Sequence, residues 1–560
     1  MRALRSREVV PSLTQKQFSM AAKLIALAFV LFAWTHRNAL SLVGFADDLG
    51  LLADLPRLAM TGELWADVAS RFIGPLWQQS TMWRPVPYAS FAFDAWAWRS
   101  SAGGWHLTNL LLHIANATVV GFLGRDLYCA ANRAGATDKS PNDFRDSACA
   151  SGALAFALFL LCPWAPEVTL WLVGRFDGWA TLFVLLALWT GLHSDESTKS
   201  AIVSLLAAAL AYASKESALI LLPWLLVTGA LVNIRSQTAT ATPARWRRWV
   251  LFVAAHLLLV VAYVAWRNHV FGSTAASVYG TSPASILQWL QQCAFLLGFP
   301  AGLASLATTA ATLTTGTTAL LLLYSWRDQA TRRVRLIGFA MSVSVIAALA
   351  LYLSGPPGSG EGYRLYYLAA AGLAIALGAL PRRMTTALTV IIVLLVLALG
   401  QWQSRVAAEW AHASFDMRAV AKSIRTIAAD LPRGDYALLL LPDQQGHVPF
   451  ARNAQGGVLA LAQRLPNADD AKPVDPLSHL IIFTPPQLNE WQRLARESVV
   501  HKLTPRADAP ANPTRYFCFD ARSGSARDLG YWPPAPPQEW SDKWRQAVAR
   551  QCPVLPANWP

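Results

Sequence analysis

Apolar stretches recur between residues 20 and 403 and alternate with short polar or basic segments. A helix needs about 20 mostly apolar residues to cross roughly 30 Å of hydrocarbon. This pattern predicts about eleven membrane-spanning helices, at 20–43, 105–128, 148–163, 167–190, 200–214, 216–234, 248–266, 306–326, 336–354, 363–381 and 384–403. Residues 284–304 are apolar but interrupted by Gln and Pro, so we expect an interfacial or re-entrant helix there.

The composition agrees with a membrane protein. Hydrophobic residues make up 54% of the 560 residues and charged residues only 14%. We therefore predict an all-α polytopic membrane protein with a C-terminal α/β domain outside the membrane.

Basic residues give the orientation, because Lys and Arg are retained on the cytoplasmic side of short loops. They recur in every predicted cytoplasmic segment, at Arg2, Arg5, Arg7, Lys16, Arg133, Lys139, Arg145, Arg235, Arg245, Arg247, Arg248, Arg327, Arg332, Arg333, Arg335, Arg382 and Arg383. The net charge of +14 is thus mostly an orientation signal, and nucleic acid is not an expected partner.

The chain then divides into three predicted parts. Residues 1–19 form a cytoplasmic N-terminus, and 20–403 a transmembrane domain whose external loop, 45–104, contains short amphipathic helices. Residues 404–560 form a soluble periplasmic domain with strand-like runs at 436–441, 480–484 and 515–519. Its cysteines, Cys518 and Cys552, lie where a disulfide is chemically permitted, but spacing does not show whether they pair.

An acidic pair, Asp47 and Asp48, lies just beyond the first apolar span, at its outer boundary. Partial loss of hydration there would raise a carboxyl pKa toward the range of a general base. The simpler interpretation is a solvated helix cap.

Other charged residues interrupt apolar stretches, where charge is expensive. Glu167, Arg175 and Asp177 either form an interhelix ion pair or line a polar cavity that orients the catalytic loop. Lys215, beside Glu216 in a predicted external turn, could bind a lipid-linked phosphate or simply extend to the interface.

A second external segment holds Glu361, Tyr363 and Arg364, after a flexible PPGSG run. Arg364 could bind a phosphate with two hydrogen bonds, or anchor the helix at the membrane surface.

A polar helical face is formed by His106, Asn109 and His113, at spacings of three and four. It is too polar for lipid, so we expect it to face the interior of the bundle. No carboxylate or Cys completes a tetrahedral set nearby, so we predict no metal site there.

Five segments together resemble the GT-C glycosyltransferase superfamily, most closely the membrane part of the transmembrane and tetratricopeptide-repeat O-mannosyltransferase family and its bacterial relatives. They are FADD, WRPVPYASFAFD with GGWHLTNLLLHIANA, CPWAPEVTLWLVGRFD, ASKESALILLP and EGYRLYYLAAAGLAI. They follow the family's order, although Cys162 and Ala165 stand where the family usually has histidines, and the tetratricopeptide repeats are missing.

The resemblance implies inverting transfer of a sugar from a polyprenyl-phosphate donor, undecaprenyl phosphate in bacteria, with Asp47 or Asp48 as base. It also implies that Lys215 and Arg364 lie near the donor phosphate, with Arg84 and Arg175 in the surrounding cavity. The acceptor, which could be a protein, a glycan or a lipid, and any requirement for a divalent metal are left open.

The leading hypothesis is a bacterial inner-membrane glycosyltransferase that acts on the periplasmic face. A polytopic transporter or lipid-linked sugar flippase is the main alternative, with the buried charges along a translocation path. A catalytically idle relative that only binds the carrier lipid would carry the same acidic pair.

Overall fold

The computed structural model describes residues 15–77, 80–132, 141–194, 197–233, 243–272, 329–349, 362–380, 385–432, 436–446, 448–452, 455–464, 480–484 and 514–532, with Cys293, Leu296, Thr318 and Cys552. Glu361 and nearly all of the predicted helices 284–304 and 306–326 lie outside these residues.

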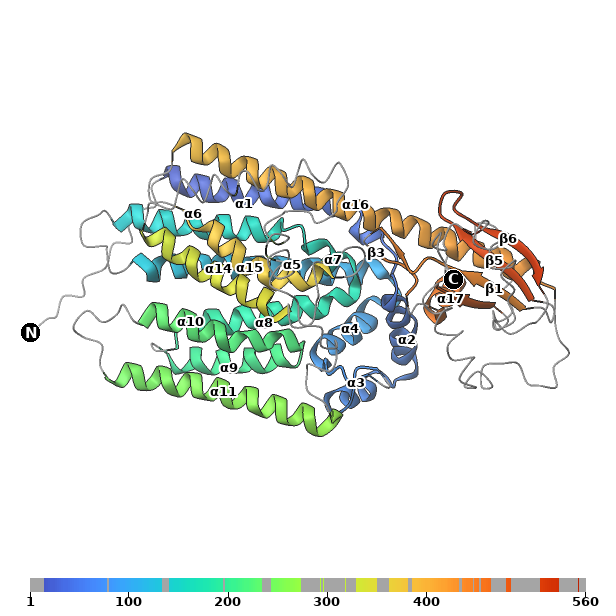
Figure 1. Cartoon of the computed structure of the whole chain (residues 1–560), viewed down its shortest axis with the longest axis horizontal. Coiled ribbons are helices and arrows are strands. Elements are labelled where there is room, and N and C mark those ends of the chain that lie inside the picture. The colour runs from blue at the N-terminus through green and yellow to red at the C-terminus, as the bar shows by residue number, and fades with distance from the viewer. Residues whose placement is uncertain are drawn as a thin grey trace, which may run out of the picture.

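Long helices lie side by side in one bundle (Figure 1). They are α1 (Gln15–Thr35), α5 (Ala102–Asn132), α6 (Pro141–Leu160), α8 (Arg175–Gly191), α9 (Thr198–Tyr212), α10 (Leu221–Asn233), α11 (Pro243–Phe271), α14 (Gln329–Leu349), α15 (Tyr367–Gly378) and α16 (Thr386–Asp430). Five described helical stretches are long and apolar enough to span a membrane, at Met20–Ser41, Ala102–Ala131, Leu172–Gly191, Trp246–Phe271 and Thr386–Asp430. The chain is thus a mostly helical membrane protein, and the count of about eleven crossings stays a prediction.

The predicted span 167–190 is shorter than expected, because the structure breaks the helix near its start and only Leu172–Gly191 is long and apolar enough to cross a membrane. A short helix α7 (Ala165–Leu170) ends at Trp171, which is extended, and the 3-10 turn η3 (Leu172–Gly174) leads into α8. The chain folds back so closely that a Cβ on Gly174 would lie 2.4 Å from the carbonyl oxygen of Glu167. Non-helical backbone is tolerated at such a place only when protein groups satisfy its hydrogen bonds.

The predicted external loop forms short helices, α2 (Asp47–Thr61), α3 (Leu64–Ile73) and α4 (Pro85–Trp98). They gather at one end of the bundle, beside the point where α16 leaves it (Figure 1). On α3, Leu64 and Val68 are buried whereas Trp65, Phe72 and Ile73 are exposed.

Helix α16 is 45 residues long and runs straight through the predicted boundary at residue 403. Beyond it lies a four-stranded sheet of order β4-β1-β5-β6, from β1 (Tyr436–Leu440), β4 (Leu480–Phe483), β5 (Thr514–Asp520) and β6 (Ser525–Trp532). Strand β1 is parallel to β4 and β5, whereas β5 and β6 are antiparallel. The three predicted strands thus form, and the assignment of 404–560 as a separate periplasmic domain stays a prediction.

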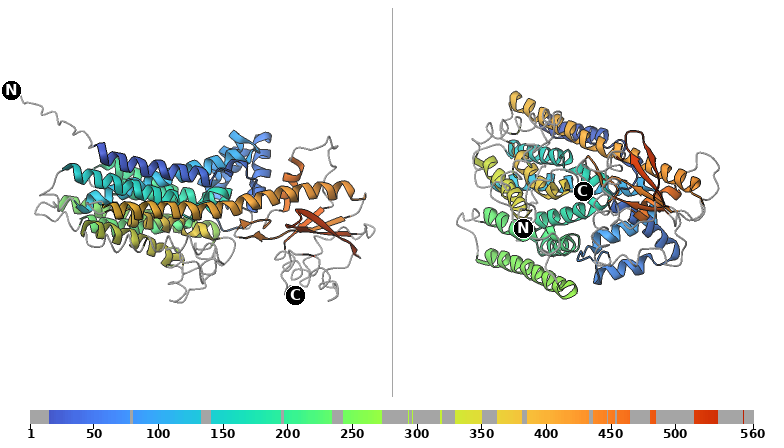
Figure 2. Two further views of the ribbon diagram at one scale, coloured as in Figure 1. Left: turned by 90° about the horizontal axis from the view of Figure 1, so that it is seen from above. Right: turned by 45° about the vertical axis from the view of Figure 1, so that its right-hand side comes forward.

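Smaller elements connect this sheet to the bundle. Strands β2 (Gln444–Gln445) and β3 (Val448–Pro449) form a short antiparallel ladder, and helix α17 (Gln455–Arg464) packs against α2. Figure 2 shows the sheet beside the outer half of α16.

A disulfide links Cys518 on β5 to Cys552, 34 residues further along the chain. It answers the question of pairing that their spacing in the sequence could not.

Replacing both cysteines with Ser should lower the stability of the outer sheet by about 2–5 kcal/mol, since the link restricts the unfolded chain. Thermal unfolding of the full protein measures this, with Cys149→Ser as the control at a described free cysteine. An unchanged unfolding temperature would contradict the expected linkage.

Candidate active site

A cavity of about 860 Å³ opens where helices α2, α3 and α4 meet the bundle and the part of the chain beyond residue 403. Its walls come from α2, α3 and α4, from the turn before α8, from η6 (Tyr363–Tyr366), and from the segment after β2. The charged residues on its walls are Asp47, Asp54, Arg57, Asp67, Arg71, Arg84, Arg364 and Arg452. Carboxylates and guanidinium groups from distant parts of the sequence therefore share one water-accessible space.

The two aspartates of the acidic pair have different surroundings. Asp47, the first residue of α2, lines the cavity and is partly exposed. Asp48 is fully buried and does not line the cavity. Neighbouring residues on one turn of helix point about 100° apart, which separates the two carboxylates.

The Asp48 carboxylate is bound by backbone amides. The N–H of Val173 donates to Oδ1 (2.9 Å), and those of Leu172 and Phe45 donate to Oδ2 (3.1 and 3.3 Å). Burial raises the pKa of Asp48 to about 8, while these donors favour its ionised form. Asp48 therefore holds the turn before α8 in place, and cannot reach an acceptor in the cavity without releasing it.

Asn109 holds the same turn from α5. Its Nδ2 donates to the carbonyl oxygens of Val168 (3.2 Å) and Trp171 (3.1 Å), and its Oδ1 accepts from Nε of Arg175 (2.6 Å). The break in the predicted span thus has its backbone oxygens satisfied by a side chain, as a buried turn requires.

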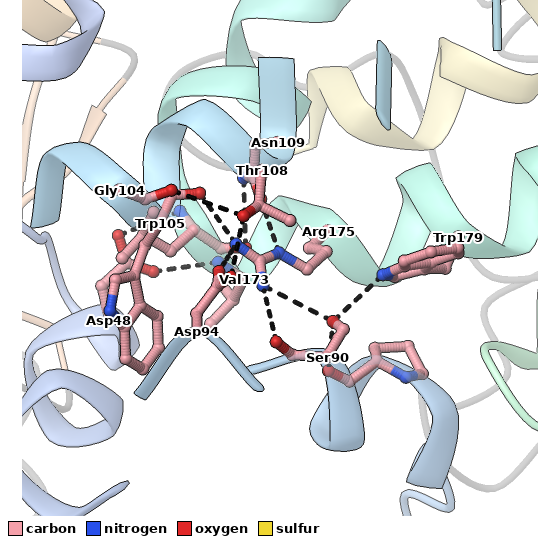
Figure 3. Close-up of polar contacts among 12 residues, drawn as sticks. Asp48, Ser90, Asp94, Gly104, Trp105, Thr108, Asn109, Val173, Arg175 and Trp179 are labelled. Carbon is pink, nitrogen blue, oxygen red and sulfur yellow. Dashed lines mark hydrogen bonds and ion pairs between the residues drawn. The ribbon is translucent and has the colours of Figure 1, made fainter. Parts of the chain in front are cut away.

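Arg175 is the centre of this network, and Figure 3 shows it among Asp94, Asn109 and Ser90. Its Nη2 lies 2.5 Å from Oδ2 of Asp94 and donates to the carbonyl oxygen of Trp105 (2.8 Å), and both charged side chains have zero exposure. Arg175 therefore forms an interhelix ion pair with Asp94 and does not line the cavity.

Asp94 was not among the predicted site residues, although the sequence carried a signal for it. It is the one acidic residue in the apolar helix 85–98, and a charge at such a position is costly unless an opposite charge pairs with it. Thr108 also donates to its Oδ1 (2.7 Å).

The cationic side of the cavity is built from paired charges. Arg84 lies 2.8 Å from Oε1 of Glu216 and packs over the ring of Phe176. Lys215 is buried against Asp177, with 2.5 Å between Nζ and Oδ1. Lys215 is not among the residues that line the cavity, so the structure does not bring it to the wall as the resemblance implied.

Arg364 joins the same group from a different helix. Its Nε lies 3.6 Å from Oδ2 of Asp177, and its guanidinium lies over the ring of Trp171, 4.3 Å from the centroid. Glu167 fixes the start of η6, because its carboxylate accepts from the backbone N–H of Gly362 (3.0 Å) and of Arg364 (3.1 Å). Arg84 and Arg364 thus reach the cavity wall, each held by a carboxylate or an aromatic ring.

The polar face of α5 points into the bundle, as predicted. His106, Asn109 and His113 are all buried, and His113 contacts the hydroxyl of Tyr367 (2.6 Å) and the carbonyl oxygen of Leu160 (3.0 Å). Tyr363 is buried as well, with its ring against Trp164. Among the described residues, no group of three or more His, Cys, Asp and Glu side chains could hold a metal ion.

Several wall residues were not predicted from sequence. They are Asp54, Arg57, Asp67, Arg71, Tyr88, Trp171, Phe176, Pro449 and Arg452. For the first five, the sequence predicted only that they lie on amphipathic surface helices of the loop 45–104. Nothing in the sequence predicted that Pro449 and Arg452 share a cavity with α2.

No protein-family model and no curated protein matches the sequence. The solved structures that are partly similar include the following two. The crystal structure of ArnT from Cupriavidus metallidurans, bound to undecaprenyl phosphate, is 12% identical with a TM-score of 0.46, over 89% of this chain and 93% of that one. Archaeal oligosaccharyltransferase AglB from Archaeoglobus fulgidus, in complex with an inhibitory peptide and a dolichol-phosphate, is 11% identical with a TM-score of 0.43, over 94% of this chain and 75% of that one. Both scores are below 0.5, so these likenesses leave the family unassigned.

Replacing Asp48 with Asn should destabilise the protein, because an amide nitrogen cannot accept from the surrounding N–H groups. A buried N–H group left without its acceptor costs about 1–3 kcal/mol. Asp47→Asn, the matched control on the cavity wall, should leave the unfolding temperature nearly unchanged. Thermal unfolding in lipid nanodiscs compares the two, and equal shifts would show that Asp48 is not the anchor.

The buried pair should also matter for stability. Asp94→Asn leaves the Arg175 charge buried without its carboxylate, which should cost about 3–5 kcal/mol. The control is Asp126→Asn, since its partner Arg125 is 42% exposed and exposed pairs are worth about 1 kcal/mol or less. A smaller effect at Asp94 than at Asp126 in denaturant unfolding would count against a structural role for the pair.

Proposed function

We propose that this protein is a membrane glycosyltransferase that moves a sugar from a polyprenyl-phosphate donor to an acceptor on the outer face of the membrane. One observation carries the proposal. The Asp47 carboxylate, Arg84 and Arg364 line one cavity, and the short helices α2, α3 and α4 that form part of its wall gather at one end of the apolar bundle. A base and a phosphate-binding pair are what such a transfer requires.

The chemistry follows from these groups. Asp47 accepts the proton of an acceptor hydroxyl as its oxygen attacks the anomeric carbon of the sugar. The bond from that carbon to the phosphate oxygen breaks, and the electron pair leaves with the polyprenyl phosphate. Attack from the face opposite the phosphate inverts the configuration at the anomeric carbon.

The arginines act on the leaving group. A guanidinium makes two parallel hydrogen bonds to phosphate oxygens, so Arg84 and Arg364 would stabilise the negative charge that develops on the phosphate. Lys215 does not line the cavity, and its buried pair with Asp177 compensates its charge, so we assign it no direct contact with the phosphate. The donor we favour is an undecaprenyl-phosphate sugar.

The proposed location is the bacterial inner membrane, with the cavity and residues 404–560 in the periplasm. The disulfide between Cys518 and Cys552 supports this side, because disulfides persist in oxidising compartments. The basic loops at the opposite ends of the helices support the same orientation.

Turnover of radiolabelled undecaprenyl-phosphate sugars by the full protein in nanodiscs tests the proposal. Asp47→Asn should lower kcat at least 100-fold and keep donor binding, since general-base catalysis contributes roughly 10²–10⁴-fold. Arg364→Ala should instead weaken donor binding, with Arg37→Ala, an exposed arginine beside Trp34, as the control.

Each other outcome has a defined meaning. Donor binding without turnover in the unaltered protein would favour a carrier-binding or flippase role. Movement of the lipid-linked sugar across the bilayer, unaffected by Asp47→Asn, would favour the flippase. Absence of donor binding would remove the lipid-phosphate donor itself.

A further inference from the structure

The loop that precedes the candidate base makes three contacts with the part of the chain beyond residue 403. The backbone N–H of Val43 donates to the hydroxyl of Ser414 (3.0 Å), and the Phe45 ring packs edge-on against Trp410, with centroids 5.4 Å apart. Both partners lie in the outer half of α16, more than 360 residues away in sequence.

Ala46 is the third contact and the one nearest to the base. Its backbone N–H donates to the carbonyl oxygen of Phe450 (2.9 Å), immediately after β3. Its backbone angles are φ 45° and ψ −122°, a conformation that residues other than Gly rarely adopt. Such strain persists only where surrounding contacts over-determine the conformation, and it is concentrated at functional sites.

Helix α17 completes the contact on the other side of Asp47. Gly457 is packed so tightly against α2 that an added Cβ would lie 2.3 Å from the backbone carbonyl carbon of Leu49. Because the obstructing atom is backbone, the neighbour cannot yield by a side-chain rotation. Only Gly allows this approach of the two helices.

We propose that residues 448–452 and helix α17, together with the outer half of α16, form the positioning segment for Asp47. It holds the strained turn at Ala46 from outside, while Asp48 holds the same turn from inside through the Phe45 amide. Asp47 lies between these two anchors and faces the cavity. The proposal rests on the proposed function for its catalytic consequence, whereas the contact with α2 is independent of it.

The same segment also forms cavity wall. Pro449 and Arg452 line the cavity, and Arg452 is fixed there by Asp443, with 2.6 Å between Nη2 and Oδ2. The outer part of the chain therefore both positions the base and closes the space in which an acceptor would lie.

Hydrogen exchange of the full protein in nanodiscs tests the contact. Gly457→Ala should raise the exchange rate of amides in residues 45–61 at least 10-fold, because the added methyl separates α17 from α2. Gln463→Ala, at an exposed position of α17, is the control and should match the unaltered protein. Unchanged exchange in Gly457→Ala would overturn the proposal, whether or not the protein shows transferase activity.

A double-mutant cycle tests the catalytic consequence. If the segment positions Asp47, the fall in kcat caused by Asp47→Asn should be at least 10-fold smaller in the Gly457→Ala background. If Gly457→Ala fails to fold, Ser414→Ala replaces it in the cycle, because it adds no bulk and removes the acceptor of the Val43 amide. We expect the same coupling to Asp47→Asn. Independent effects of Asp47→Asn in both backgrounds would overturn the positioning role, because a purely structural loss scales all activity equally.

Discussion

The buried carboxylate of Asp48 is the interaction on which the candidate site depends. It ties the start of α2 to the turn between α7 and α8 through the amides of Leu172 and Val173. A buried acceptor of this kind is expensive to leave unsatisfied, so the two segments stay together. Arg175, at the end of the same turn, bonds Asn109 on α5 and pairs with Asp94 on α4, so these two helices are tied to the turn as well.

This constraint assigns different roles to neighbouring residues of identical chemistry. Asp48 accepts hydrogen bonds from three backbone N–H groups, so of these two aspartates only Asp47 lines the cavity. A similar division applies to the cations. Arg175 forms a buried ion pair with Asp94, whereas Arg84 and Arg364 line the cavity. Charges that hold the site and charges that face it are therefore distinct sets.

The sequence predicted much of the helical part. Apolar length located the helices, and the spacing of His106, Asn109 and His113 predicted a face that is indeed buried. It could not predict the break at Trp171, because a broken helix whose backbone is satisfied by Asp48 and Asn109 has the same apolar composition as a continuous one. Nor could it place Pro449 and Arg452 in the cavity, since that depends on how the outer part packs on α2.

The most direct measurement is an electron cryo-microscopy structure of the protein in nanodiscs with unsubstituted undecaprenyl phosphate. The account predicts phosphate density within hydrogen-bonding distance of Arg84 and Arg364, with the Asp47 carboxylate facing the same cavity and Asp48 still bound to the amides of the turn. Phosphate bound elsewhere in the bundle, with the cavity empty, would contradict it.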